Sequence, residues 1–144
     1  LYLAVHEDVQ RSVYGQFNEA ADGAAGFLAK FDAVLDIAHE LNEADPTFAA
    51  FLGVVRTDMR RHPEIAEALA THAERRNGFF VRLVDAGVDS GEIAPANREF
   101  MNEFVAILLV GLTDGVSDDV ERHARATDSI KMALRGELIV HPAP

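Results

Sequence analysis

One uninterrupted apolar stretch, from Phe104 to Leu112, limits the possible folds of this chain more than any other feature. It lies in a segment of helical character, about 96–116, whose middle turns carry no polar side. A helix that is apolar all round must be covered on every side. The stretch is much shorter than the roughly 20 residues needed to cross a bilayer. We therefore expect a soluble globular protein in which one side of this helix meets the core and another side meets a second subunit.

Apolar residues recur at helical spacing along almost the whole chain, and no stretch alternates for long enough to predict a strand. Asp45 before Pro46 is typical of a helix start. His62 before Pro63 predicts a helix end, and Gly91 predicts another. The pattern predicts an all-α fold in which residues 1–144 form one domain, an antiparallel bundle of about six helices, over about 1–21, 25–43, 46–61, 63–89, 96–116 and 118–136.

The charge balance limits the partners of the chain. Thirteen Lys and Arg residues stand against twenty-four Asp and Glu residues, which gives a net charge of −11. Such a chain repels the phosphates of nucleic acids, so we expect no DNA binding by this chain alone. The sequence contains no cysteine and begins without the basic and apolar order of a signal peptide. We expect a cytoplasmic location.

Motifs for catalysis, cofactors or metals are missing from the sequence. There is no Gly-x-Ser-x-Gly elbow and no glycine-rich phosphate loop. Asp36, His39, Glu40 and Glu43 have the spacing of metal ligands on one helix face. Di-iron bundles, however, need Glu-x-x-His on two helices, and the chain has no such motif. We predict no catalytic residue, no metal and no cofactor, and we interpret the acidic cluster as a solvated face.

Two polar residues interrupt the apolar stripe of the predicted helix 63–89. His72 and Arg76 fall on the same face as Leu69 and Leu83, within about 40° at 100° per residue. A buried guanidinium without a partner costs several kcal/mol, so Arg76 needs a partner there. The partner is a ligand in a cavity, carbonyl groups, water or an internal carboxylate, for which the candidates are Asp58, Glu103 and Asp114. Alternatively, the side chain extends to the rim, where its charged end reaches solvent.

Most of the phenylalanines fall in the apolar stripes of the predicted second to fifth helices. Aromatic side chains are ordinary core residues, but they also line the cavities in which helical bundles bind small apolar molecules. Together with the polar pair, they predict a ligand-binding set that consists of Phe27, Phe31, Phe51, Val55, Met59, His72, Arg76, Phe80 and Phe104.

The order of these features resembles the C-terminal domain of TetR-family transcriptional regulators. The opening Leu1–Glu7 is similar to the start of the family's linking helix, and Phe79–Gly87 followed by Gly91-Glu92-Ile93 is similar to its long central helix and the turn that ends it. The apolar helix and the last helix look like the family's dimerisation pair. The resemblance implies a homodimer that binds a small, partly apolar effector, shifts its geometry and releases DNA. It also implies that DNA is bound only through an N-terminal helix-turn-helix domain, which this chain lacks.

Two apolar stripes compete for the dimer interface on helix 96–116. One consists of Phe100, Phe104, Ile107 and Gly111, and we predict that this aromatic stripe faces the core. The other stripe and the last helix then supply the predicted interface, which comprises Met101, Val105, Leu108, Leu112, Val120, Ala124, Ile130 and Leu134.

A second function remains open at the level of sequence. Histidine is the side chain best suited to exchange protons near neutral pH, so His72 beside Arg76 has the chemistry for acid–base work on a carboxylate-bearing ligand. The alternative prediction is therefore a small helical enzyme or binding protein that uses these two residues.

Overall fold

The computed structural model describes the backbone of all 144 residues and every side chain except that of Tyr2. This part of the chain is all-α: it contains seven α-helices, one 3-10 turn and no strand. The bounds are α1 Tyr2–Asp22, α2 Phe27–Ala44, α3 Pro46–Arg61, α4 Pro63–Ala68, α5 Ala70–Ser90, η1 Pro95–Asn97, α6 Arg98–Gly115 and α7 Val120–Leu134. Over the described chain, no helix is both long and apolar enough to cross a membrane.

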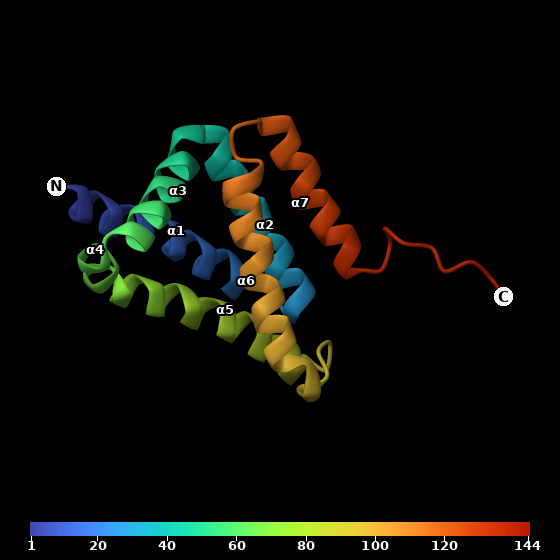
Figure 1. Cartoon of the computed structure of the whole chain (residues 1–144). Coiled ribbons are helices and arrows are strands. Elements are labelled where there is room, and N and C mark those ends of the chain that lie inside the picture. The colour runs from blue at the N-terminus through green and yellow to red at the C-terminus, as the bar shows by residue number, and fades with distance from the viewer.

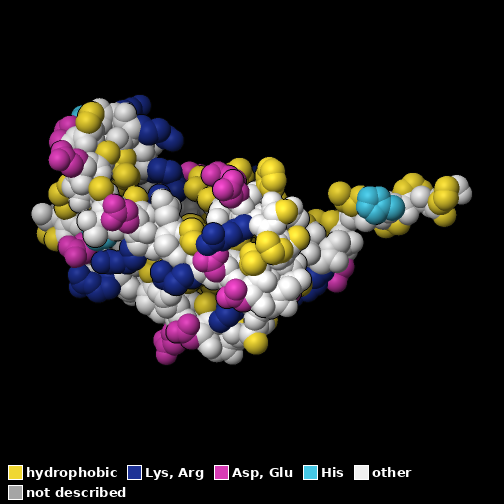
Figure 2. Space-filling view, turned by 90° about the horizontal axis from the view of Figure 1, so that it is seen from below, with side chains coloured by type: hydrophobic (Ala, Val, Ile, Leu, Met, Phe, Trp, Pro, Cys, Tyr) yellow, Lys and Arg dark blue, Asp and Glu magenta, His cyan; other side chains and the backbone are white. Residues whose placement is uncertain are grey.

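Helix α2 lies at the centre of the arrangement and packs against α1, α3, α5 and α7. Helix α6 packs against α5, α3 and α7, so it closes the side of the molecule opposite α1 (Figure 1). The C-terminal tail after α7 has no regular structure and stands away from the body in two views (Figures 1 and 2). On the face shown in Figure 2, basic and acidic side chains are mixed with apolar atoms.

The predicted helix ends are confirmed where a cap or a stop was present in the sequence. The Asp45 side chain accepts a hydrogen bond from the Thr47 backbone N–H at 3.0 Å, with Pro46 at the first helical position. Asp119 caps α7 in the same way, with the Arg122 N–H as donor at 3.0 Å. Gly91 ends α5 in the left-handed conformation, with φ of 82°.

The predicted single helix 63–89 is wrong, because the chain turns at Leu69. This residue has φ −101° and ψ 4°, which separates the short α4 from α5. No proline or glycine marks the break; the Leu69 side chain is instead buried, with 2% exposure. The turn lets α4 connect α3 to α5 at one corner of the molecule (Figure 1). The six predicted helices therefore become seven.

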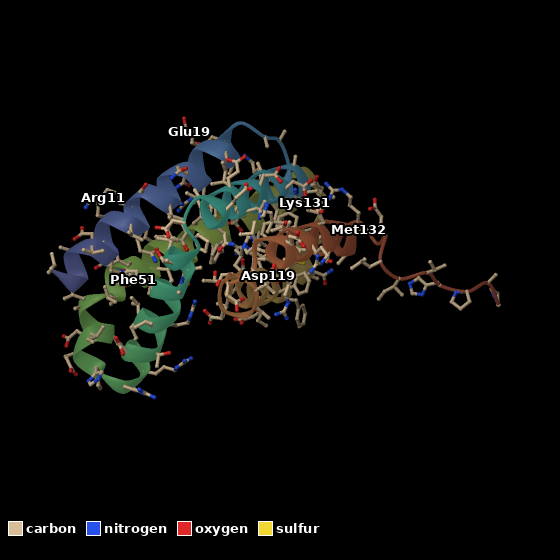
Figure 3. All side chains as sticks on the ribbon, turned by 90° about the horizontal axis from the view of Figure 1, so that it is seen from above. Arg11, Glu19, Phe51, Asp119, Lys131 and Met132 are labelled. Atoms are coloured by element: carbon tan, nitrogen blue, oxygen red, sulfur yellow. The ribbon has the colours of Figure 1, made fainter. Side chains whose placement is uncertain are left out.

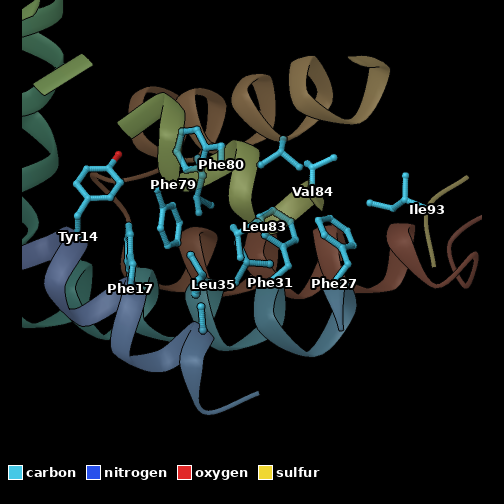
Figure 4. Packing of buried hydrophobic residues seen from close by; sticks show 14 residues of the cluster. Tyr14, Phe17, Phe27, Phe31, Leu35, Phe79, Phe80, Leu83, Val84 and Ile93 are labelled. Carbon is cyan, nitrogen blue, oxygen red and sulfur yellow. The ribbon is translucent and has the colours of Figure 1, made fainter. Parts of the chain in front are cut away.

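A row of aromatic rings forms the core between α1, α2 and α5 (Figure 4). Phe27 stacks on Phe31 with 5.5 Å between ring centroids, and neither ring is accessible to solvent beyond 2%. At the other end of the row, Tyr14 meets Phe17 and Phe79 edge to face, at 5.6 Å each. Such pairs stabilise the fold by about 0.5–1.5 kcal/mol beyond the contribution of the apolar area that they bury.

The turn after α5 is fastened to the start of α2. The Glu92 carboxylate accepts hydrogen bonds from the backbone N–H groups of Phe27 and Leu28. Gly87 lets the turn come close, because a Cβ there would lie 2.5 Å from Ile93 Cδ1 and 2.8 Å from Phe27 Cβ. Position 87 is consequently packed without room for an added methyl group.

The orientation of α6 is the reverse of the prediction. Val105 and Leu112 are buried in the core of the same chain, with exposures of 0% and 5%, and Met101 and Leu108 pack against that core. The aromatic stripe faces outward instead: Phe100 is 75% exposed, and exposed apolar residues continue along the same side at Phe104, Ile107 and Val110. A helix that is apolar all round gives no sequence signal about which side faces inward.

Helix α7 lies against α2, and polar pairs fix this contact. His39 Nδ1 and His123 Nδ1 are 3.0 Å apart in a stacked pair, while Lys131 pairs with Asp36 and Arg135 with Asp32. Figure 3 shows Lys131 and Met132 at the end of α7 from which the tail leaves. Of the predicted interface residues on α7, Ile130 and Leu134 pack against the core, whereas Val120 and Ala124 are half-buried. No group of three potential metal-ligating side chains converges among the described residues.

Candidate functional site

A polar pocket lies between α1, α3, α5 and α6, near the break at Leu69. It has a volume of about 520 Å³ including its mouth. The break places the first turns of α5 beside α1, so that side chains of both helices point into one space. The lining residues of the polar pocket are His6, Gln10, Tyr14, Leu52, Val55, Arg56, Met59, Leu69, His72, Ala73, Arg76 and Thr113.

A second, apolar pocket of about 670 Å³ including its mouth adjoins the polar pocket. The two share Gln10, Tyr14, Leu52 and Thr113 in their walls. Its lining residues are Gln10, Val13, Tyr14, Phe17, Ala38, Leu41, Asn42, Phe48, Ala49, Leu52, Phe80, Leu109, Leu112 and Thr113. A combined space with one apolar end and one polar end is typical of small-molecule sites.

Two histidines and an arginine define the polar end. The rings of His6 and His72 meet edge to face with 5.5 Å between centroids, and His6 is only 5% exposed. Burial lowers the pKa of His6, and the neighbouring His72 and the positive charge of Arg76 lower it further. Neutral imidazole is thus the favoured form of His6 at neutral pH.

Two of the three carboxylates considered as partners of Arg76 do not pair with it. Asp114, one of the three candidates, pairs with Arg56 at 2.6 Å, and no ion pair connects Arg76 to Asp114 or to Glu103. Arg76 is half-buried and lines the polar pocket. The pocket therefore presents a guanidinium in its wall, although the whole chain is acidic.

Tyr14 stands in the wall shared by the two pockets. Burial raises the pKa of Tyr14 to about 12, and this exceeds the opposite effect of the Arg76 and Arg56 charges. The phenol consequently stays protonated at neutral pH and remains a hydrogen-bond donor.

Several polar atoms around the pockets are buried without a hydrogen-bond partner among the described residues. They include Nδ1 of His6, Nδ1 of His72 and both amide atoms of Asn42. Leaving a buried donor or acceptor unsatisfied costs about 1–3 kcal/mol. Native proteins retain few such groups, and each requires an explanation. Among the described residues, all such side-chain atoms except Asn102 Oδ1 belong to residues that line the two pockets.

The structure brings together five of the nine predicted ligand residues. Val55, Met59, His72 and Arg76 line the polar pocket, and Phe80 lines the apolar one. Phe51 is outside both linings, although its ring lies 6.3 Å from that of His6.

The other three predicted ligand residues lie elsewhere. Phe27 and Phe31 stack on each other in the core near Ile93, and Phe27 lines a different pocket, at the turn after α5. Phe104 is 41% exposed on the outer side of α6. Their placement in the site was wrong because apolar periodicity identifies a buried face without identifying what that face meets.

Sequence analysis missed His6, Tyr14 and Asn42. The apolar spacing of the first helix predicts a stripe through Leu1, Val5, Val9, Val13 and Phe17. Phe17 is buried, but Leu1 and Val5 are exposed, and the buried line runs through His6 and Tyr14 instead. The spacing of His6, Tyr14 and Phe17 is also helical, so it could have predicted that these three residues share one face of the helix. Asn42 is 5% exposed at the end of α2, and no sequence pattern distinguishes it from a solvated residue there.

Comparison with known proteins provides no relative for this chain: no protein-family description, no curated protein and no solved structure matches it.

Proposed function

We propose that this chain is the effector-binding and dimerisation half of a one-component transcriptional regulator of the TetR type. One observation carries the proposal: α1 and α6 both contribute to the walls of the two pockets. His6, Gln10 and Tyr14 come from α1, while Leu109, Leu112 and Thr113 come from α6. In the proposed regulator, α1 is the helix that connects to the DNA-binding domain, and α6 belongs to the dimer interface.

A ligand in this space touches both helices at once. It shifts the equilibrium between two dimer arrangements only by binding one of them more tightly. Typical couplings between sites are about 1–3 kcal/mol, which corresponds to a five- to 150-fold change in affinity for DNA. A small displacement of α1 would change the spacing of the two DNA-binding domains relative to half-sites about one helical turn apart.

The pocket chemistry supports a small, partly apolar effector with an anionic or carbonyl group. The apolar end offers the rings of Phe17, Phe48 and Phe80, and the polar end offers Arg76. Charge-assisted hydrogen bonds to such a group contribute about 1.5–3 kcal/mol.

The exposed stripe of α6 supports the dimer. Phe100 and Ile107 are 75% and 67% exposed, and they continue into Phe104 and Val110 on the same side. A continuous apolar face of this kind marks an interaction surface. The proposed interface consequently uses this stripe with the outer side of α7, in place of the stripe that contains Val105.

Analytical ultracentrifugation tests the dimer directly. Ile107→Arg places a charge on the exposed stripe and should produce a folded monomer at micromolar concentration. Glu19→Arg, on the exposed side of α1, adds positive charge away from α6 and should remain dimeric. A monomeric wild-type chain, or a dimeric Ile107→Arg variant, would contradict this part of the proposal.

The coding sequence ahead of Leu1 distinguishes the regulator from the alternative. A regulator requires roughly 45–60 further residues with a basic helix-turn-helix pattern. The edge contact between His6 and His72 beside Arg76 favours the alternative, a small enzyme or binding protein that acts on a carboxylate. Native mass spectrometry of the purified chain, recorded without added ligand, would show a retained small molecule in either case. Only the regulator predicts that this molecule releases the intact protein from DNA.

A further inference from the structure

Asn42 is the least expected polar residue near the apolar pocket. Its side chain is 5% exposed, and both amide atoms, Oδ1 and Nδ2, lack a hydrogen-bond partner among the described residues. The wall of this pocket is mostly apolar, with Leu41, Phe80 and Leu109 among its residues, and Gln10 and Thr113 also contribute polar groups to it. A neutral acceptor and a neutral donor therefore lie side by side in mostly apolar surroundings.

A carboxamide with both atoms free matches one kind of chemical group. Its oxygen accepts from an N–H or O–H, while its nitrogen donates to an adjacent C=O, so the two hydrogen bonds form a closed pair. The groups that present this edge are a lactam or another cis amide, a primary amide and an un-ionised carboxylic acid. An ionised group is disfavoured here because the pocket wall is mostly apolar.

We infer that Asn42 is the specificity-determining residue of the apolar pocket, and that it recognises a neutral lactam or amide edge on an otherwise apolar ligand. The inference rests on the proposed ligand-binding function and assigns the polar chemistry of its second end. Arg76 and Asn42 then bind different groups of the ligand. Arg76 binds an anionic or carbonyl group in the polar pocket, and Asn42 binds an amide edge in the apolar pocket. A simple hydrocarbon would leave the amide of Asn42 unpaired.

The exclusion of water from the Asn42 amide determines how strongly it favours one ligand over another. Neither amide atom is accessible to water. A ligand reaches them by shifting the side chains that cover them, and its hydrogen bonds replace none to solvent. Sites whose buried polar groups are left unpaired by an analogue reject that analogue strongly. We expect at least a roughly tenfold preference for a compound with the amide edge over its hydrocarbon counterpart.

The test uses three bicyclic probes of nearly the same shape. They are 3,4-dihydroquinolin-2-one, which has the lactam edge, its N-methyl derivative, which lacks the donor, and tetralin, which lacks both groups. Dissociation constants are measured by calorimetry for the wild type, Asn42→Leu and the control Asn77→Leu, whose site is exposed on α5. The Asn42 side-chain NH₂ signal, assigned by its loss in Asn42→Leu, is followed by nitrogen–proton NMR. In parallel, binding of 1-anilinonaphthalene-8-sulfonate, an apolar anion, reports whether the site binds a ligand at all.

The expected result is that the wild type and Asn77→Leu prefer the lactam to tetralin and to the N-methyl compound, and that the Asn42 signal shifts only with the lactam. Asn42→Leu should lose the preference while it retains the dye. Equal affinities for the three probes in the wild type, or an unchanged preference in Asn42→Leu, would overturn the inference while dye binding leaves the proposed site intact. Failure of the wild type to bind the dye or any probe would overturn both.

Discussion

The two halves of α5 belong to one helix but face different surroundings. Phe79, Phe80, Leu83, Val84 and Gly87 of the second half are buried. None of the residues from Ala70 to Gly78 is buried, and His72, Ala73 and Arg76 line the polar pocket. The second half faces the aromatic rings of α1 and α2, whereas the first half faces His6 and Arg56. The comparison teaches that one helix can supply a packed core with its second half and a pocket wall with its first.

The largest loss of stability is expected from a cavity in the aromatic core that the second half of α5 faces. Phe31→Ala removes a ring with 0% exposure and should lower the free energy of unfolding by about 3–5 kcal/mol. Leu3→Ala, at a side chain on α1 that is 42% exposed, provides the control and should have a much smaller effect on the fold. Urea denaturation of both variants at equal protein concentration measures the difference. Equal losses in the two variants would contradict the packing described for the core.

Substitutions that add atoms should affect stability less, and they should affect the two halves of α5 differently. Gly87→Ala forces a methyl group to within 3 Å of Ile93 and Phe27 and should cost about 1–3 kcal/mol. Ala73→Met, in the wall of the polar pocket, finds space and should change stability by less than about 1 kcal/mol. Thermal unfolding of the two variants compares them. If Ala73→Met destabilised the protein as much as Gly87→Ala, the polar end would be packed like the core.

The polar end also predicts a dependence of stability on pH. Because the pKa of His6 is lowered in the folded protein, the unfolded chain takes up a proton first as the pH falls below about 6.5. Stability should therefore decrease between about pH 6.5 and the folded pKa of His6, by at most about 1.4 kcal/mol per pH unit for this group. The buried His123, whose pKa is lowered by burial and by His39, acts in the same direction.

Urea titrations at several pH values check this dependence. His6→Leu should have a shallower decrease than the wild type in this range, and His141→Leu, in the exposed tail, serves as its control. An unchanged slope in His6→Leu would show that His6 does not titrate differently in the folded and unfolded chain.

The sequence predicted the elements better than their surroundings. Asp45, Asp119 and Gly91 act locally through a side-chain cap or a left-handed turn, so the helix ends beside them were predictable. The break at Leu69 was not, because it arises from burial of that side chain at a tertiary contact. The orientation of α6 was not predictable either, because both sides of this helix are apolar. Which side faces inward depends on the helices that cover it.

Only part of the candidate site was predicted, because only some of its residues give a signal within a single helix. His72 and Arg76 were visible as polar residues in an apolar stripe, and they do line one pocket. The role of His6 and Asn42 depends on helices that approach from elsewhere in the chain. A single-helix pattern contains no information about such an approach.

The most direct test of the account is the affinity of 1-anilinonaphthalene-8-sulfonate for the wild type, Arg76→Met and Arg75→Met. Arg75 neighbours Arg76 on α5 but is exposed, so the two variants remove the same charge from inside and outside the pocket. Fluorescence titration, with circular dichroism to verify folding, should show affinity reduced about ten- to a hundredfold in Arg76→Met alone. Equal affinity in both variants, or no binding by the wild type, would contradict the claim that the polar end of α5 forms a ligand site.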